Sequence, residues 1–180
     1  VADYLAKSAA ASAGYGYSNL GISMVFNDVL ARYEINRAKV NAFDGSGLSH
    51  ENRISTETLA QVLLKMINNP KFAPAINGLP VGGISGTLQR RFIKSAPQAV
   101  GLVHAKTGSI SGVVSLAGYI ESGPHKYVFA IIADRVGRNY YAESAARAKI
   151  DKLLGRIAYP LEIATAPEIT PTLSPETITS

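Results

Sequence analysis

Apolar residues recur at every third or fourth position in several stretches of the chain, which is the pattern of helices that bury one face. Ser18 and Ser55 stand where two of these stretches begin, and a serine hydroxyl is suited to cap the first free N–H groups of a helix. The sequence therefore predicts helices over residues 2–12, 19–33, 56–67 and 139–158, with one more short helical turn at 71–77.

Three segments in the second half of the chain are apolar over shorter lengths and are separated by turn residues, as strands are. They cover residues 102–107, 113–121 and 126–134. Because the turns between them, GSISG and SGPH, are short, we expect an antiparallel meander. With helices first and a sheet later, the pattern predicts an α+β fold in which the last helix lies across the sheet.

Residues 159–180 have a different composition from the rest. Four prolines fall between positions 160 and 175, threonine and serine lie among them, and no helical period continues. The predicted organisation is therefore one folded unit over 1–158 and an extended or disordered tail over 159–180. The sequence contains no apolar run of the roughly 18 residues that a membrane-spanning helix needs.

Charge and composition limit the kinds of partner, active site and metal site that the chain can have. The chain is 47% hydrophobic and carries a net charge of +5, but its basic residues are scattered and do not alternate with aromatic ones, so we expect no nucleic-acid partner. The chain has no cysteine, which excludes disulfides, thiolate metal sites and a cysteine nucleophile. Its three histidines do not have the spacing of metal ligands, and no cofactor is predicted.

The segment LVHAKTGS, residues 102–109, places a lysine inside an otherwise apolar strand. A lone lysine of this kind is usually an edge-strand charge that discourages aggregation. Here Thr107 and Ser109 add hydroxyl donors beside the Lys106 charge, and Gly108 leaves room for another backbone. Together these groups suit an extended peptide that ends in a carboxylate.

Lys-Thr-Gly is also the third signature of penicillin-binding proteins and serine β-lactamases. Three longer motifs occur in order: DGSGLSHENRIS at 44–55, LPVGGISGTLQRRF at 79–92 and HAKTGSISGVVSLAGYI at 104–120. With them, residues 1–158 closely resemble the D-alanyl-D-alanine carboxypeptidases of the peptidase S13 family, the type-4-like penicillin-binding proteins. The resemblance implies a penicillin-binding protein/β-lactamase-like fold, to which this chain gives the C-terminal portion of the catalytic domain and three strands of the sheet.

The resemblance also implies an activity. Such an enzyme is periplasmic or extracytoplasmic, with or without membrane association, and removes the terminal D-Ala from peptidoglycan stem peptides through a serine acyl-enzyme, often cleaving cross-links as well. Lys106 would supply positive potential, Thr107 and Ser109 would bind the terminal carboxylate, and the strand around Gly108 would pair with the peptide. An amide near Ser109 to Ile110 would be an oxyanion donor, and β-lactam antibiotics would acylate the same serine.

Three residues in the first motif are secondary candidates for substrate binding. Asp44 and Ser46 are expected either to line the cleft or to stabilise a turn through their side chains. His50 stands where the family often has arginine, so it is a candidate for recognising an acidic group of the stem peptide, with a charge that depends on pH. We expect His104 to pack and His125 to be solvated.

Neither S-x-x-K nor S-x-N occurs in residues 1–180. We therefore expect the nucleophile and its partners to come from another part of the protein or another chain, and this chain alone to be inactive. The same missing part is expected to pair with the strand at 126–134. Two alternatives remain: a non-catalytic module of the same fold that binds peptidoglycan peptide or a partner protein, and a plain α+β domain in which KTG is coincidental.

Overall fold

Five α-helices and a three-stranded sheet make up residues 1–158, the part of the chain that the computed structural model describes. The predicted tail at 159–180 lies outside the described residues. None of the described helices combines the length and the apolar character that a membrane crossing requires. In chain order the elements are α1 (Ala2–Ser12), α2 (Asn19–Arg32), α3 (Thr56–Ile67), α4 (Ala73–Asn77), β1 (Val103–Ile110), β2 (Val113–Ser122), β3 (His125–Ala133) and α5 (Tyr140–Ala158).

The helix starts follow the capping residues. The Ser18 hydroxyl accepts a hydrogen bond from the Gly21 N–H, and the Ser55 hydroxyl accepts one from the Thr58 N–H, each at 3.0 Å. The predicted turn at 71–77 consists of a 3₁₀ turn, η1 (Pro70–Phe72), followed by α4. Two further 3₁₀ turns, η2 (Gly86–Leu88) and η3 (Pro97–Ala99), lie in the connection to β1.

The sheet is the predicted antiparallel meander, with strand order β1-β2-β3. Ile110 lies opposite Val113, and Ser122 lies opposite His125, so two-residue turns join the strands. Gly112 has φ +81° and Gly123 has φ +55°, which is the left-handed backbone that such turns favour. β1 continues to Ile110, three residues beyond its predicted end at 107, because Gly108 and Ser109 pair with β2 although both are common turn residues.

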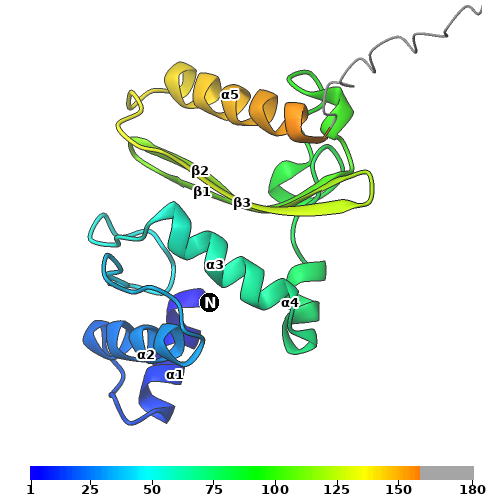
Figure 1. Ribbon diagram of the computed structural model, residues 1–180. Helices are drawn as coiled ribbons and strands as arrows, with labels where there is room; N and C mark the ends of the chain where they lie inside the picture. Colours follow the sequence, from blue (N-terminus) through cyan, green and yellow to red (C-terminus); the bar gives the residue numbers. More distant parts are fainter. Residues whose placement is uncertain (159–180) are drawn as a thin grey trace, which may run out of the picture.

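The sheet lies between helices, with α5 on one face and α3 on the other (Figure 1). The α5 face holds the main core, where Leu116, Ile120 and Leu154 are fully buried. α1 and α2 lie on the far side of α3 from the sheet (Figure 1). The α+β prediction and the placement of the last helix across the sheet are confirmed.

An ion pair anchors α5 to the segment that precedes the sheet. The Arg91 guanidinium donates to Asp151 of α5, and only 12% and 5% of their side chains are exposed. The second carboxylate oxygen of Asp151 accepts from the Ser95 hydroxyl at 3.0 Å. Because both oxygens are satisfied, this buried charge holds the two segments in one relative position.

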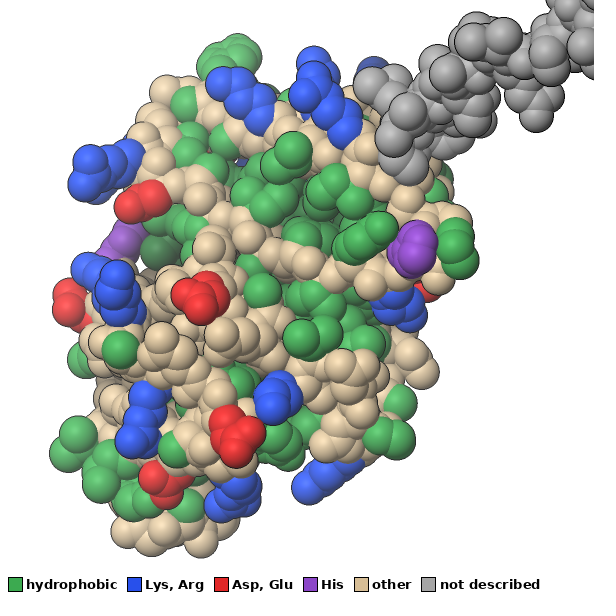
Figure 2. Space-filling view, viewed as in Figure 1, with side chains coloured by type: hydrophobic (Ala, Val, Ile, Leu, Met, Phe, Trp, Pro, Cys, Tyr) green, Lys and Arg blue, Asp and Glu red, His purple; other side chains and the backbone are tan. Residues whose placement is uncertain are grey.

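The outer side of β3 has no neighbouring strand among residues 1–158. Hydrogen-bonding directions alternate along an antiparallel strand, and the Glu121 N–H bonds to Leu102, on the β1 side. The register then turns the backbone groups of four β3 residues away from β2: Lys126, Val128, Ala130 and Ile132. In the face drawn in Figure 2, hydrophobic side chains gather at the level of the sheet.

Candidate functional site

The outer edge of β1 is covered along its first half and open along its second. The Gly82 N–H donates to the Val103 carbonyl at 2.8 Å, and the Ala105 N–H donates to the Pro80 carbonyl at 2.9 Å. Backbone directions alternate, so the N–H groups of Thr107 and Ser109 also point outward. No hydrogen bond joins either of these two N–H groups to another residue within 1–158.

Lys106 places its charge at the open half of this edge. Its side chain is exposed, and its ammonium group donates to the Thr107 carbonyl at 2.7 Å. That carbonyl is one of the outward backbone groups, so the cation lies beside the groups that an added strand would meet. An incoming carboxylate would find a positive charge next to unpaired N–H donors.

Two hydroxyl groups lie on the α5 side of the same edge. Thr107 Oγ1 is 3.0 Å from Thr87 Oγ1, on the turn η2. Ser109 Oγ accepts a hydrogen bond of 3.2 Å from the Arg147 guanidinium of α5. These side chains share a face with the buried Val103 and Ala105, while Lys106 belongs to the opposite face, as the alternation predicted.

The structure gives Gly108 a different neighbour from the one expected. A Cβ atom at this position would lie 2.3 Å from Ser115 Oγ of β2, so Gly108 makes room for that hydroxyl rather than for an approaching backbone. Ile110 closes the hairpin opposite Val113, and the alternation directs its N–H toward β2. Of the two predicted oxyanion amides, the geometry therefore favours that of Ser109.

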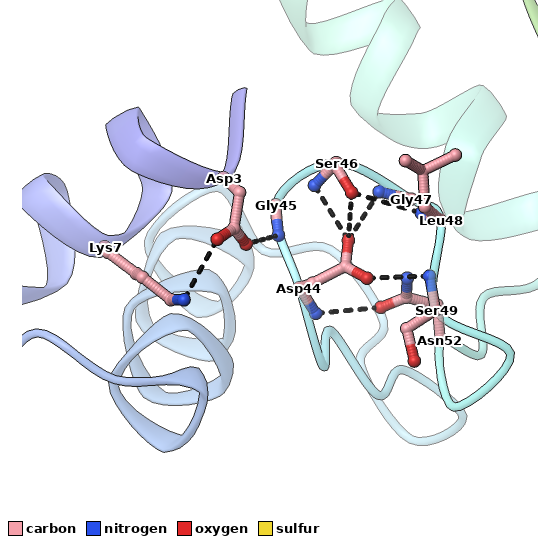
Figure 3. A network of polar contacts seen from close by, with 9 residues as sticks. All are labelled: Asp3, Lys7, Asp44, Gly45, Ser46, Gly47, Leu48, Ser49 and Asn52. Atoms are coloured by element: carbon pink, nitrogen blue, oxygen red, sulfur yellow. Dashed lines mark hydrogen bonds and ion pairs between the residues drawn. The ribbon is translucent and has the colours of Figure 1, made fainter. Parts of the chain in front are cut away.

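Asp44 is the centre of a closely bonded loop (Figure 3). One carboxylate oxygen accepts from the backbone N–H groups of Ser46 at 2.8 Å and Gly47 at 2.6 Å, and the other accepts from the Ser49 N–H at 2.7 Å. Burial on its own would raise the pKa of Asp44, but the hydrogen bonds from Gly47, Ser46, Ser49 and Asn52 outweigh it and hold the pKa below its usual range.

Figure 3 shows that this loop is also tied to α1, where Asp3 accepts from the Gly45 N–H at 3.0 Å and pairs with Lys7. The Ser46 hydroxyl donates to Asp44 at 3.0 Å. The His50 side chain is exposed, while its carbonyl accepts from Arg53. No hydrogen bond or ion pair within residues 1–158 joins Asp44, Ser46 or His50 to β1, and their role in substrate binding stays a prediction.

Asp44 and Ser46 do line a cavity of about 570 Å³, but it is not at the β1 edge. It lies between α2, α3 and the loop around residues 40–54, and its walls are almost entirely apolar, with Phe26, Val29 and Leu59 among them. No residue of β1 contributes to it. We therefore place the candidate site at the strand edge and not at this cavity.

His104 packs as expected. Its ring stacks on Tyr119 with 4.6 Å between ring centroids, and the Lys126 ammonium lies 4.3 Å from the centroid of the same Tyr119 ring. Burial is the main reason why the pKa of His104 is lowered, and the nearby Lys126 charge acts in the same direction. The neutral His104 imidazole therefore packs against the neighbouring strand and adds no charge to the edge that carries Lys106.

Thr87, Ser115 and Arg147 lie at the site but were not among the predicted residues. They reach β1 from a 3₁₀ turn, the neighbouring strand and the last helix. Nothing in their spacing along the chain links them to residues 106–109. A sequence signal exists only for Arg147, which stands four residues after Glu143 and forms the i,i+4 ion pair expected on a helix.

Residues 1–157 match the D-Ala-D-Ala carboxypeptidase 3 (S13) family over nearly all of the described chain. The chain belongs to the peptidase S13 family. Carboxypeptidase DacB of Mycolicibacterium smegmatis is 30% identical over 142 residues, which are 76% of this chain and 31% of that protein. Penicillin-sensitive carboxypeptidase A of Dictyostelium discoideum is 42% identical over 100 residues, 51% of this chain and 19% of that protein.

Solved structures agree with this S13 assignment. Penicillin binding protein 4 of Haemophilus influenzae, solved in complex with a β-lactam, superposes with a TM-score of 0.75 at 26% identity, over 88% of this chain and 38% of that one. A β-lactamase of Sphaerobacter thermophilus, at TM-score 0.54 and 18% identity, shares the fold. The predicted family and the penicillin-binding protein/β-lactamase-like fold are confirmed. This S13 chain spans less than a third of the length of the two curated relatives named above.

Proposed function

We propose that residues 1–158 form the substrate-binding wall of a serine-type D-Ala-D-Ala carboxypeptidase that acts on peptidoglycan stem peptides. Membership of the S13 family supports the reaction class. The observation that carries the proposal is the open half of β1, where the Lys106 cation and the outward N–H groups of Thr107 and Ser109 lie together. The proposed location is periplasmic or otherwise extracytoplasmic, where this substrate is found.

In this mechanism the stem peptide adds to β1 as an antiparallel strand. Its terminal carboxylate lies against Lys106 and the hydroxyl groups of Thr107 and Ser109, which are the donors that suit a carboxylate. The carbonyl of the scissile bond lies at the Ser109 N–H, which stabilises the negative charge that develops on its oxygen. The strand thus fixes both ends of the bond that is cleaved.

The nucleophile of this proposal is a serine outside residues 1–180, with a neighbouring base that removes its proton. The serine oxygen attacks the carbonyl carbon, the C–N bond breaks, and D-Ala leaves after its nitrogen accepts a proton. Water then attacks the acyl-enzyme and releases the shortened peptide. A β-lactam acylates the same serine, and a cross-link that presents the same D-amino-acid carboxylate is a second substrate for the site.

Labelling of the full-length protein with a fluorescent penicillin tests the proposal. We expect one covalently labelled band, and release of D-Ala from a peptide that ends in D-Ala-D-Ala. Preincubation with unlabelled penicillin should abolish both signals. A full-length protein that carries S-x-x-K and S-x-N but neither binds penicillin covalently nor releases D-Ala would contradict it.

A second candidate function is a non-catalytic module that binds peptidoglycan peptide or a partner protein along the same edge. It would use the same outward N–H groups and the same Lys106 cation, but it requires no nucleophile. The two candidates differ in one measurement. The binding module would bind a D-Ala-D-Ala peptide reversibly and without turnover, even when the full-length protein is used.

A further inference from the structure

Arg147 connects the last helix to the open edge of β1. One nitrogen of its guanidinium group donates to Ser109 Oγ at 3.2 Å and to Glu143 Oε2 at 2.8 Å. The side chain is about one-third exposed, so it borders the edge without being fully in solvent. Ser109 itself is exposed, and its N–H is one of the outward backbone donors.

Contacts with Arg91, in the segment before the sheet, hold the helical turn that carries Arg147 in place. Arg91 donates to the Arg147 carbonyl at 3.3 Å and to Asp151 Oδ1 through its Nε at 3.1 Å. This Arg91–Asp151 pair is nearly buried, and Ile150 and Leu154 pack into the core on either side of it. The backbone that carries the Arg147 side chain is therefore held in one position, as is needed for a group that orients another side chain.

The hydrogen bond to Ser109 determines what the serine hydroxyl can do. A hydroxyl has one hydrogen to donate and two lone pairs that accept. Arg147 can only donate, so it occupies a lone pair of Ser109 Oγ and leaves the O–H to point elsewhere. Since the guanidinium lies on the α5 side, the free direction for that hydrogen includes the open edge.

We propose that Arg147 is a positioning residue for the substrate carboxylate: it orients the Ser109 hydroxyl as a donor toward the peptide's free C-terminus. The inference rests on the proposed function. Glu143 holds the guanidinium and offsets much of its charge, so the effect of Arg147 comes from orienting Ser109 more than from net positive potential. Arg147 therefore favours peptides with a free terminal carboxylate over amidated ones.

The test compares two peptides in the full-length protein: one that ends in D-Ala-D-Ala with a free carboxylate, and the same peptide amidated at its C-terminus. We expect R147A to lower kcat/KM for the free carboxylate by about 10–100-fold, mostly through KM, because a hydrogen bond to a charged group is weakened. The amidated peptide should lose no more than about 3-fold. R156A is the matched control, because Arg156 is exposed on the same helix.

A double-mutant cycle shows whether Arg147 acts through Ser109. If it does, R147A/S109A should be no worse than S109A alone, and R147K, which keeps a donor, should recover part of the loss. Additive effects of R147A and S109A, or an equal loss for both peptides, would overturn the proposal. Should R147A fold poorly in circular dichroism and thermal melting, R147M, which keeps the length of the side chain but has no donor, gives the same comparison.

Failure of the Arg147 inference can be distinguished from failure of the proposed function. If the unaltered protein neither cleaves the free-carboxylate peptide nor is labelled by penicillin, the proposed function fails. Calorimetric binding of the two peptides to the unaltered protein, R147A and R156A then tests Arg147 independently. Binding that prefers the free carboxylate and loses that preference only in R147A supports the inference, and no preference in the unaltered protein refutes it.

Discussion

Asp44 and Lys106 are both charged residues of the motifs described above, but their side chains have different hydrogen-bond partners. The Asp44 carboxylate accepts its hydrogen bonds inside its own loop, whereas the Lys106 ammonium bonds a carbonyl at an open strand edge. A carboxylate saturated by backbone donors stabilises the loop that contains it. A cation beside unpaired N–H groups is available to a ligand. At the scale of single residues, these environments separate a structural role from a candidate binding role.

Replacing Asp44 by asparagine should lower the free energy of unfolding at pH 7 by about 1–3 kcal/mol, because the amide NH₂ would face the Ser49 N–H and charge-assisted bonds are lost. The depressed pKa of Asp44 means that its carboxylate stabilises the fold above the unfolded pKa of about 4, and that this contribution is lost as pH falls through the lower folded pKa. Urea denaturation between pH 2 and pH 7 measures both effects.

The control is E51Q, which removes a carboxylate from an exposed position in the same loop. We expect it to leave stability nearly unchanged at every pH. A D44N protein as stable at pH 7 as the unaltered one would show that the bonds around Asp44 do not hold the loop.

Lys106 to alanine should reduce the rate of penicillin acylation of the full-length protein by on the order of 100-fold, since a charge fixed beside the reacting groups is removed. Stability should change little, because the Lys106 side chain is exposed. Stopped-flow or gel-based acylation rates measure the effect, with K152A on α5 as the exposed-lysine control. Equal rates for K106A and K152A would remove Lys106 from the site.

At the scale of elements, the two glycines of the β1–β2 pair show why the strands meet as they do. A Cβ atom on Gly118 would lie 2.0 Å from the His104 carbonyl oxygen and 2.6 Å from Ala105 Cα, which are backbone atoms. On Gly108 it would meet the Ser115 hydroxyl, which can rotate away. Gly118 is therefore required for strand pairing, whereas a side chain at Gly108 would only displace the Ser115 hydroxyl.

The prediction is that G118A destabilises the protein by about 3 kcal/mol or more, since the two backbones must separate. G108A should cost only about 1 kcal/mol, the scale of a strained side-chain rotamer. Chemical denaturation measures both. G108A combined with S115G should recover the stability of S115G alone, whereas no second-site glycine should recover G118A. Comparable losses for the two single variants would contradict this assignment.

Local signals predicted most of the elements. Ser18 and Ser55 marked helix starts, apolar spacing marked the helices, and short turns fixed the antiparallel order of the strands. The end of β1 was misplaced because Gly108 and Ser109 favour turns when considered alone, and only pairing with β2 makes them a strand. The pairing of residues 80–82 with β1 and the contact of Arg147 with Ser109 join segments that are distant in the sequence, so no local sequence pattern predicts them.

At the scale of the whole molecule, both sides of the sheet have backbone positions that no other residue within 1–158 pairs with. The β1 side offers Thr107 and Ser109, and the β3 side offers a longer row that includes Val128, Ala130 and Ile132. Unpaired strand edges of this length attract other strands. This agrees with the expectation that another part of the protein completes the sheet at β3, a pairing that we propose.

Ala130 to proline should have opposite effects in two contexts, because it removes an outward N–H without removing a bond to β2. In residues 1–158 produced alone, it should reduce self-association measured by light scattering after gel filtration. In the full-length protein it should lower stability by about 1–3 kcal/mol through loss of a ladder bond. A130G, which keeps the N–H, is the control. The same sign in both contexts would argue against a strand partner at β3.

The cover at residues 80–82 gives the β1 edge a closed end. A peptide that pairs antiparallel with β1 advances with its C-terminus toward Ala105, where the Pro80 carbonyl already accepts the backbone hydrogen bond. A longer main chain could not continue the same pairing past that point, because the backbone groups of Ala105 and Val103 are already bonded to residues 80–82. The edge would therefore limit the main chain beyond the cleaved bond to one residue with a free α-carboxylate, and would refuse the interior of a polypeptide.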